Sequence, residues 1–412
     1  MISKFNCLSG RKEIAMRKYI LMNWSNEVAL LNIEMEPKAG FIQDMEILHT
    51  EYLPFPVRFS KGGMKIDAME SWIMRRMMSP RRFNLENLTS LTGKNLMELS
   101  FESYGLTVTD GYWFCPVDQD LKWDDINFFD HDFRYDVGNM IFGIKNSNPD
   151  LMSPDLTTNG QMEKTWRKRD GSIWLLKKGS PPYYEEPFNE KAVSKLLEKI
   201  SKVPFVSYDV VFVCRYAVSI CQNFTEKGIE FVSAADIMKT AEKPAFISVD
   251  DHLRERCKYL KIPGYKTFLD QIRLLDYIIA NYDRHLGNYG FLYDTTRNEF
   301  IGPAPIFDNG SSLWCQDSLV KSETQKKLRE KSKESLRYIH HPETMILPEF
   351  QKGEIRDIVE SVYMEAAITS ERARAIGNHL VGRYISAREE IERAAEIKLA
   401  KVNNPRLISI EI

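Results

Sequence analysis

The sequence predicts an α+β protein in which strand-rich segments come first and a mainly helical segment follows. Strand-like runs and hairpin signals lie before about residue 235, whereas apolar residues beyond 236 recur mostly at helical spacing. No internal repeat or low-complexity tract interrupts this order. We therefore predict three parts: an N-terminal accessory α/β region at 1–135, a small mixed α/β part at 136–235 and a larger helical part at 236–412.

The composition is that of a globular protein. The 412 residues are 43% hydrophobic and 11% aromatic, enough to bury large cores. The net charge of −2 gives no general reason to expect direct binding of nucleic acid or of an anionic membrane. The chain has no apolar run of about 18 to 20 residues and no secretory signal at its N-terminus, so we expect a cytoplasmic protein. The six cysteines lack metal-ligand spacing.

The N-terminal region mixes strands and helix. The apolar runs "KYILMNW" at 18–24 and "EVALLNIEM" at 27–35 are typical of strands, and "NLENLTSLTGKNLMELSFE" at 84–102 has the pattern of one helix. The segment 143–160 is rich in Asn, Pro, Asp and Gly and predicts a loop.

The small middle part begins with a predicted hairpin. Asp170-Gly171 stands between two strand-like arms within 161–178, and glycine tolerates the positive φ of a tight turn. A helix is predicted next, because apolar residues in 187–200 recur at helical spacing. The runs "FVCRYAV" at 212–218 and "IEFVSAADIM" at 229–238 look like further strands.

The helical part contains one segment whose end carries polar chemistry. In 265–282, Phe268, Ile272, Leu275 and Ile279 form one buried stripe, which predicts a helix packed in a core. The stretch "NYDRHLGNYGFLYD" follows this helix directly. Residues 352–402 have the pattern of two or three amphipathic helices, and 321–337 is a basic stretch typical of a solvated segment.

Three oxygen-bearing side chains are predicted to meet after that helix. Asp283 and Asn288 lie in the polar stretch, and a hairpin signal at 290–301 folds the chain so that Asp308 returns toward them. Phosphoryl transfer needs one carboxylate to orient the acceptor hydroxyl, and an amide and a second carboxylate to hold Mg²⁺ on the nucleotide. The interval from Asp283 to Asn288 equals that in the catalytic loop of protein kinases.

The first half of the chain can supply the nucleotide contacts. The segment "TTNGQ" at 157–161 could cover phosphates with its backbone N–H groups. Lys177 on the second hairpin strand and Glu190 on the next helix are candidates for the ion pair that positions the nucleotide phosphates. The order of loop, Lys, Glu, Asp, Asn and Asp is that of a kinase.

These motifs together resemble the HipA-like serine/threonine kinases. The segments that carry the resemblance are "TTNGQMEKTW", "WLLKKG", "EPFNEK", "DRHLGNYGF" and "PIFDNGSSLW", within roughly 137–400. The resemblance implies a two-lobed protein-kinase-like fold, with a small mixed lobe and a larger helical lobe, that uses ATP and Mg²⁺. It implies the catalytic base at Asp283, metal ligands at Asn288 and Asp308, the nucleotide lysine at Lys177 and its helix partner at Glu190.

The resemblance also extends to the loop that would cover the phosphates and to His285, which we expect to orient the catalytic loop. It implies autophosphorylation at Thr157 or Thr158, and further nucleotide contacts from a group of neighbouring residues: Thr158, Asn159, Gly160, Gln161 and Lys164. One departure is Gly287, which stands where the family commonly has a lysine. Arg284 or Lys164 could replace the missing positive charge.

Structural alternatives exist for each of these residues. Asp283 and Asn288 could simply turn the chain at a helix end, and Glu190 could serve the helix dipole. Strand alternation places Lys177 and Lys178 on opposite faces, so one of them is expected to be exposed.

Three functions remain open from sequence. The first is a kinase that phosphorylates Ser or Thr in a cytoplasmic protein, as a growth-arresting toxin or regulator with a neutralising partner. The second is a lipid or small-molecule kinase, since "DRHLGN" also resembles the phosphoinositide kinase loop. The third is a nucleotide-binding scaffold without activity.

Overall fold

The chain forms a mixed α/β protein with two compact units. The computed structural model describes residues 15–36, 40–60, 64–82, 84–315, 336–366 and 368–403. Unit 1 comprises Met1–Thr107 and Gly111–Gln161, and unit 2 comprises Val108–Asp110 and Met162–Ile412. Unit 1 therefore continues past residue 135, while the three-part division at 135 and 235 stays a prediction.

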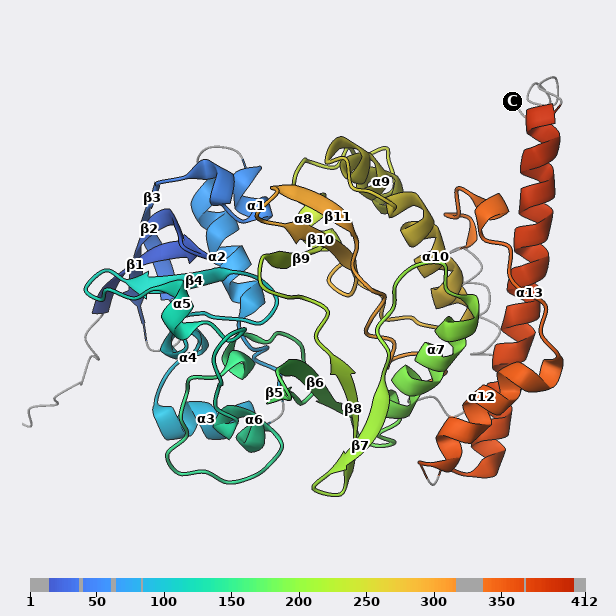
Figure 1. Cartoon of the computed structure of the whole chain (residues 1–412), viewed down its shortest axis with the longest axis horizontal. Coiled ribbons are helices and arrows are strands. Elements are labelled where there is room, and N and C mark those ends of the chain that lie inside the picture. The colour runs from blue at the N-terminus through green and yellow to red at the C-terminus, as the bar shows by residue number, and fades with distance from the viewer. Residues whose placement is uncertain are drawn as a thin grey trace, which may run out of the picture. The chain divides into compact units, whose positions relative to one another are not determined.

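Unit 1 is built on a four-stranded antiparallel sheet. The sheet has the order β3 (Gly40–Ile47), β2 (Asn26–Met35), β1 (Ala15–Asn23) and β4 (Tyr112–Pro116) (Figure 1). Alternate apolar side chains of the strands face a core that also takes in Met69 and Trp72 of one helix. Its described helices and 3-10 turns are η1 (Thr50–Tyr52), α1 (Phe55–Arg58), α2 (Lys65–Arg76), α3 (Leu85–Thr92), α4 (Leu96–Glu102), α5 (Trp123–Ile126), α6 (Asp136–Ile141) and η3 (Pro154–Thr157).

The prediction of a single helix over 84–102 is wrong, because the chain breaks at Gly93. Gly93 adopts φ +65 and ends α3, a conformation that glycine takes without steric cost. Asn95 then begins α4 by accepting a hydrogen bond from the Glu98 N–H, and the Glu98 side chain caps Asn95 in return. The capping pair and the glycine together outweigh the continuous apolar pattern.

Unit 2 begins with a second four-stranded antiparallel sheet. Its order is β5 (Lys164–Arg169), β6 (Ser172–Lys178), β8 (Tyr216–Gln222) and β7 (Asp209–Val213), and α7 (Glu186–Ile200) packs on it (Figure 1). The predicted hairpin is confirmed: Asp170 and Gly171, at φ +51 and +75, form the turn between β5 and β6.

The run at 212–218 is a hairpin rather than one strand. Cys214 and Arg215 form its two-residue turn with φ +48 and +71, between β7 and β8. Such a turn requires positive φ at both central residues and usually contains Asn or Gly. Cys-Arg carries no such signal, so local sequence did not indicate the reversal.

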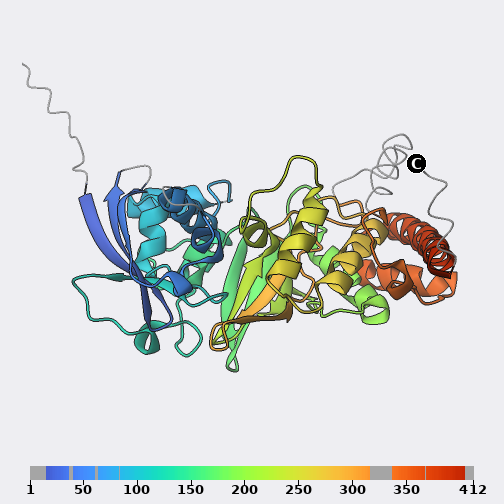
Figure 2. The same cartoon turned by 90° about the horizontal axis from the view of Figure 1, so that it is seen from above.

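The rest of unit 2 combines a small sheet with long helices. The strands β11 (Glu299–Pro303), β10 (Gly290–Asp294) and β9 (Ile229–Ser233) pair in that order, which confirms the hairpin predicted after Asn288. In Figures 1 and 2, α9 and α10 lie between the strands of this unit and the pair formed by α12 and α13. The described helices and 3-10 turn are α8 (Ala234–Met238), α9 (Val249–Tyr259), α10 (Tyr265–Ile278), η4 (Pro342–Thr344), α12 (Lys352–Met364) and α13 (Ser370–Asn403).

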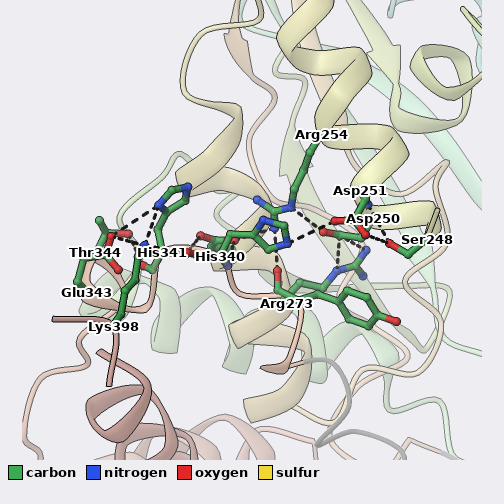
Figure 3. Close-up of polar contacts among 12 residues, drawn as sticks. Ser248, Asp250, Asp251, Arg254, Arg273, His340, His341, Glu343, Thr344 and Lys398 are labelled. Atoms are coloured by element: carbon green, nitrogen blue, oxygen red, sulfur yellow. Dashed lines mark hydrogen bonds and ion pairs between the residues drawn. The ribbon is translucent and has the colours of Figure 1, made fainter. Parts of the chain in front are cut away.

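A buried ionic network ties α9 and α10 to the chain near residue 340 (Figure 3). Arg254 contacts Asp250 at 2.6 Å and Asp270 at 2.7 Å. Asp270 also accepts backbone hydrogen bonds from His340 and His341, at 3.1 and 2.9 Å. Asp270 therefore holds the chain that precedes η4. Most of the predicted basic stretch 321–337 lies outside the described residues.

Within the part of the chain that the structure describes, no helix has both the length and the apolar character needed to cross a membrane.

Candidate active site

One buried lysine joins three separate segments of unit 2. The Lys177 ammonium on β6 lies 2.5 Å from Glu190 Oε1 on α7 and 2.5 Å from Asp308 Oδ1, beyond β11. The side chains of Lys177 and Glu190 are 6% and 1% exposed, whereas that of Asp308 is 32% exposed. Ser219 on β8 donates its hydroxyl proton to the other oxygen of Glu190. The predicted Lys177–Glu190 pair therefore forms, and Asp308 presents a partly open carboxylate beside it.

The charges of this cluster stabilise one another. Burial alone would lower the pKa of Lys177, but the carboxylates of Asp308 and Glu190 raise it above its ordinary value. Burial alone would likewise raise the pKa of Asp308, but the cations of Lys177 and Lys164 hold it well below its usual range. Asp308 is therefore an anion at any pH near neutrality, as a metal ligand must be.

The expectation that one of the two strand lysines is exposed is wrong. Lys178 is 7% exposed and forms a 2.7 Å ion pair with Glu163, just before β5. Its ammonium also lies 3.7 Å from the ring centroid of Tyr216 on β8. Both faces of β6 are covered at this point, so alternation along the strand separates the two lysines without exposing either.

The predicted catalytic loop turns tightly between α10 and β10. The side-chain oxygen of Asn281 accepts from the Asp283 N–H at 3.1 Å, and the Asp283 carbonyl accepts from the His285 N–H at 2.9 Å. The Asn288 amide donates to the same carbonyl at 3.3 Å. The Asp283 carboxylate is exposed, whereas Asn288 is 9% exposed. The loop thus holds Asn288 inward and leaves Asp283 exposed.

His285 shapes this loop as expected. Its Nδ1 accepts a hydrogen bond from the Gly287 N–H at 3.1 Å, while the ring stays exposed. A side chain at 287 would start only 3.0 Å from that ring, so Gly287 allows the close approach.

Arg284 pins the catalytic loop to the chain around Asp308. Its guanidinium is 3% exposed and pairs with buried Asp276 at 3.0 Å. It also donates to the carbonyls of Phe307 at 2.6 Å and of Asn288 at 3.3 Å, and to the side chain of Asn309. Arg284 therefore holds the loop through these bonds, and replacement of the charge missing at 287 by Arg284 or Lys164 stays a prediction.

Asp308 occupies a constrained position. Its backbone lies in the left-handed region, at φ +59, which costs a residue other than glycine about 1 kcal/mol or more. Its N–H donates to the Tyr208 hydroxyl at 3.3 Å. Tyr208 and Arg284 thus fix a backbone that directs the carboxylate at Lys177.

Three phenylalanine rings form a cluster in unit 2. The rings of Phe224, Phe231 and Phe307 contact one another with centroids 5.4 to 5.7 Å apart. Phe224 and Phe307 also pack against the buried group of Val206, Tyr208 and Cys221, as does Leu175 of β6. The three rings are only half-buried, and Phe231 packs edge-on against the other two.

The residues of the predicted phosphate loop belong to unit 1. Thr157 is buried and donates its hydroxyl proton to the Leu106 carbonyl at 2.6 Å, and the Thr158 hydroxyl donates to the Pro154 carbonyl at 2.7 Å. Arg82 donates to the Gly160 carbonyl at 3.2 Å. The structure therefore shows how this loop is held inside unit 1, and the nucleotide contacts of Thr158, Asn159, Gly160 and Gln161 stay predictions.

The sequence did not indicate several residues that organise the site. Tyr208, Ser219 and Asn189 act through partners far along the chain, so no local pattern marks them. Arg284 stands in the motif, but its partners are carbonyl groups that only the fold supplies. Asn189 lies among the apolar positions of the helix predicted at 187–200, and a polar residue there indicates a buried hydrogen-bond partner.

The donor set suits Mg²⁺-ATP. Magnesium is usually bound by one or two carboxylates or amides together with phosphate oxygens and water, rather than by a full protein cage. Asp308 and Asn288 offer such oxygens. Among the residues described, no three His, Cys, Asp or Glu side chains gather as a metal site.

Part of the chain is similar to a curated kinase. A curated relative, the serine/threonine-protein kinase CtkA of Helicobacter pylori strain J99, is 29% identical over 102 residues. This match covers 23% of the present chain and 31% of the relative. Over the part that this match covers, the chain is similar to a serine/threonine-protein kinase, as the resemblance drawn from sequence implies.

The solved structures that are similar to the chain include CtkA and a HipA protein. The crystal structure of the H. pylori proinflammatory kinase CtkA is 18% identical with a TM-score of 0.43, covering 59% of this chain and 94% of CtkA. HipA of Shewanella oneidensis MR-1, solved with HipB and operator DNA, is 12% identical with a TM-score of 0.44. That match covers 92% of this chain and 99% of the HipA chain. No protein-family model matches the chain.

Proposed function

We propose that the protein is an ATP- and Mg²⁺-dependent kinase that phosphorylates Ser or Thr in a protein. The observation that carries the proposal is the position of Lys177, which contacts Glu190 and Asp308 at once. In kinases a strand lysine, its helix glutamate and a metal-binding aspartate must all be in place for transfer. The β5-β6-β8-β7 sheet with α7 would be the small lobe of a two-lobed kinase fold, and the helices after β9 the large lobe.

Each residue has a distinct role in this proposal. Lys177 holds the α- and β-phosphates, and Asn288 and Asp308 hold Mg²⁺, which neutralises charge on the transferred phosphoryl group. Asp283 accepts the proton of the acceptor hydroxyl, which its exposure allows. Lys164 pairs with Lys177 across the β5–β6 ladder and supplies the cation that Gly287 lacks. The aromatic cluster of Phe224, Phe231 and Phe307 contacts the adenine ring of ATP.

The partners are proposed from the resemblance. The acceptor is a protein hydroxyl, with autophosphorylation at Thr157 or Thr158 as one outcome. Because the HipA neighbour is a toxin–antitoxin protein solved with HipB, a neutralising protein partner belongs to the proposal. We propose no direct contact with nucleic acid or membrane.

Radiolabelled transfer tests the proposal. Wild-type protein incubated with labelled ATP and Mg²⁺ should label itself or an added protein mixture. Asp283→Ala should lower that rate by about 10² to 10⁴-fold, because it removes the proposed catalytic base. Asp283 is exposed, so its removal leaves no buried group without a partner. Asp118→Ala, at another exposed aspartate, is the matched control and should label like wild type. Thermal unfolding checks that both variants keep the fold.

The same assay separates the alternatives. Equal labelling of wild type and Asp283→Ala would contradict the role of Asp283. Label entering phosphoinositides or small alcohols but no protein would identify a lipid or small-molecule kinase. Stabilisation by ATP and Mg²⁺ without any transfer would identify a scaffold.

A further inference from the structure

Asn189 links α7 to the loop that follows Asp308. Its side-chain nitrogen donates to the Gly310 carbonyl at 2.8 Å and to the Ser312 carbonyl at 2.9 Å. Its side-chain oxygen accepts a hydrogen bond from the Tyr363 hydroxyl on α12. Asn189 is 0% exposed and Tyr363 is 0% exposed, so these bonds form without competition from water. Both amide hydrogens and the oxygen are used, which leaves one orientation of the amide.

Asn189 links the segments that carry the two carboxylates in contact with Lys177, one on α7 and one in the loop. It directly precedes Glu190, whose carboxylate contacts Lys177. The carbonyls that it binds lie two and four residues beyond Asp308, the other partner of Lys177. One amide therefore sets the distance between the helix that carries Glu190 and the loop that carries Asp308.

The loop needs such a restraint. Asp308, Leu313 and Trp314 all have left-handed backbones, at φ +59, +53 and +57. Residues in this region persist only where the surroundings hold them, and they cluster at functional sites. The Leu313 N–H donates to the Ile279 carbonyl at 2.8 Å, which fixes the far end of the loop to the C-terminus of α10. Asn189 fixes the near end.

The contact between the loop and α7 is also close. A Cβ added to Gly310 would lie 3.0 Å from the Glu186 Cβ and 3.4 Å from the Glu186 carbonyl oxygen. Any side chain at 310 would therefore push the loop away from the helix.

A second tie strengthens the same junction. Arg372 on α13 pairs with buried Glu185 through two bonds of 2.5 and 2.6 Å, and it donates to the Trp314 carbonyl at 3.3 Å. Glu185 stands at the start of α7. Helices α12 and α13 thus both reach the junction between α7 and the Asp308 loop.

We propose that Asn189 is a positioning residue that holds Asp308 in its metal-binding geometry and couples it to α12 through Tyr363. The inference rests on the proposed kinase function. In this proposal, the Mg²⁺ requirement of the enzyme depends on Asn189, which touches neither metal nor nucleotide. Partners of metal ligands commonly change metal affinity or activity by about 10 to 100-fold when they are lost.

The test measures initial rates against free Mg²⁺ and against ATP. It also measures Mg²⁺ binding in the presence of ATP by titration calorimetry, where Asn189→Ala should weaken binding by about 10-fold. Asn189→Ala should raise the half-saturating Mg²⁺ concentration by about 10-fold and lower kcat by about 10 to 100-fold, with KM for ATP at saturating Mg²⁺ little changed. Tyr363→Phe should move both quantities in the same direction but less. Gly310→Ala should reproduce the Mg²⁺ effect by displacing the loop, although it leaves Asn189 intact.

Controls separate positioning from loss of fold. Asn127→Ala removes a buried asparagine of unit 1 that likewise caps neighbouring backbone groups, and it should leave the Mg²⁺ dependence unchanged. High Mg²⁺ should restore part of the Asn189→Ala rate but not that of Asp308→Asn, which lacks the ligand itself.

Two results would overturn the inference. If the wild type is active and folded Asn189→Ala keeps its Mg²⁺ dependence, Asn189 is only structural, and the kinase assignment stands. If the wild type neither transfers phosphate nor binds ATP with Mg²⁺, the proposed function fails and the positioning role fails with it.

Discussion

Asp308 combines an unfavourable backbone with a favourable charge environment. Its carboxylate lies beside Lys177, and its backbone is held at φ +59 by Tyr208 and Arg284. Its pKa lies well below the ordinary value of 3.8 because the nearby cations outweigh its burial. Asp308 therefore stays ionised wherever the protein is folded near neutral pH, and it should not set the acidic limb of a pH–rate profile.

The depressed pKa predicts how stability depends on pH. A carboxylate whose pKa is lower in the folded state stabilises the fold above its unfolded pKa and loses that contribution as pH falls through the folded pKa. The wild type should therefore lose more free energy of unfolding below about pH 4 than Asp308→Asn does. Urea unfolding at several pH values measures this, and parallel curves for the two proteins would contradict the lowered pKa.

At the scale of elements, one carboxylate secures the junction of α9, α10 and the chain before η4. Asp270 on α10 is 0% exposed and accepts hydrogen bonds from Arg254, His340 and His341. Its removal would leave a buried guanidinium with fewer partners, and two partly buried backbone N–H groups would lose the acceptor described for them. Such groups are costly to bury unpaired.

Asp270→Ala should lower the free energy of unfolding by about 3 to 5 kcal/mol, as expected when one partner of a buried ion pair is removed. Asp251→Asn is the matched control, because its side chain is 48% exposed and its 3.7 Å contact with His340 lies at the surface (Figure 3). That change should cost less than about 1 kcal/mol. Chemical denaturation compares the two, and equal losses would show that the buried network adds no stability.

The two hairpins of the small sheet show what local sequence can predict. Asp170-Gly171 predicts its turn, because glycine and aspartate accept the positive φ values that the turn requires. Cys214-Arg215 makes a similar turn without either residue, so the reversal must be imposed by the pairing of β7 with β8. The break at Gly93 was predictable from glycine and the capping pair, but the continuous apolar pattern concealed it.

At the scale of the whole molecule, the two compact units have separate cores. The unit 1 core gathers side chains of β1 to β4 and of neighbouring helices, such as Leu21, Leu31 and Trp72. In unit 2, Phe268, Ile272 and Leu275 of α10 are likewise buried, as the predicted stripe requires. Chains of this size with more than one core generally do not unfold in a single all-or-none step.

Thermal unfolding should therefore show more than one transition. Asp270→Ala should lower the midpoint of the transition that unfolds unit 2, and Asn127→Ala that of unit 1. Hydrogen exchange resolved by segment assigns each transition, with β1 and β2 reporting on unit 1 and α10 on unit 2. A single transition that both substitutions shift equally would contradict separate cores.

The sequence by itself determined the elements whose signals are local. It predicted the β5–β6 hairpin, the helix that ends before the catalytic motif, and the hairpin between Asn288 and Asp308, because turn chemistry and apolar spacing act within a few residues. The order of residues along the chain also predicted Lys177 and Glu190 as an ion pair and Asp308 as a metal ligand.

Only the tertiary structure decided how those residues are held. Lys177 and Asp308 are 131 positions apart, and Asn189 lies 174 positions from Tyr363. Burial of Lys178 beside Glu163 and the commitment of Arg284 to backbone carbonyls likewise depend on which groups the fold brings near. A buried polar side chain must find a partner wherever the chain supplies one, and that partner is specified by packing rather than by neighbouring sequence.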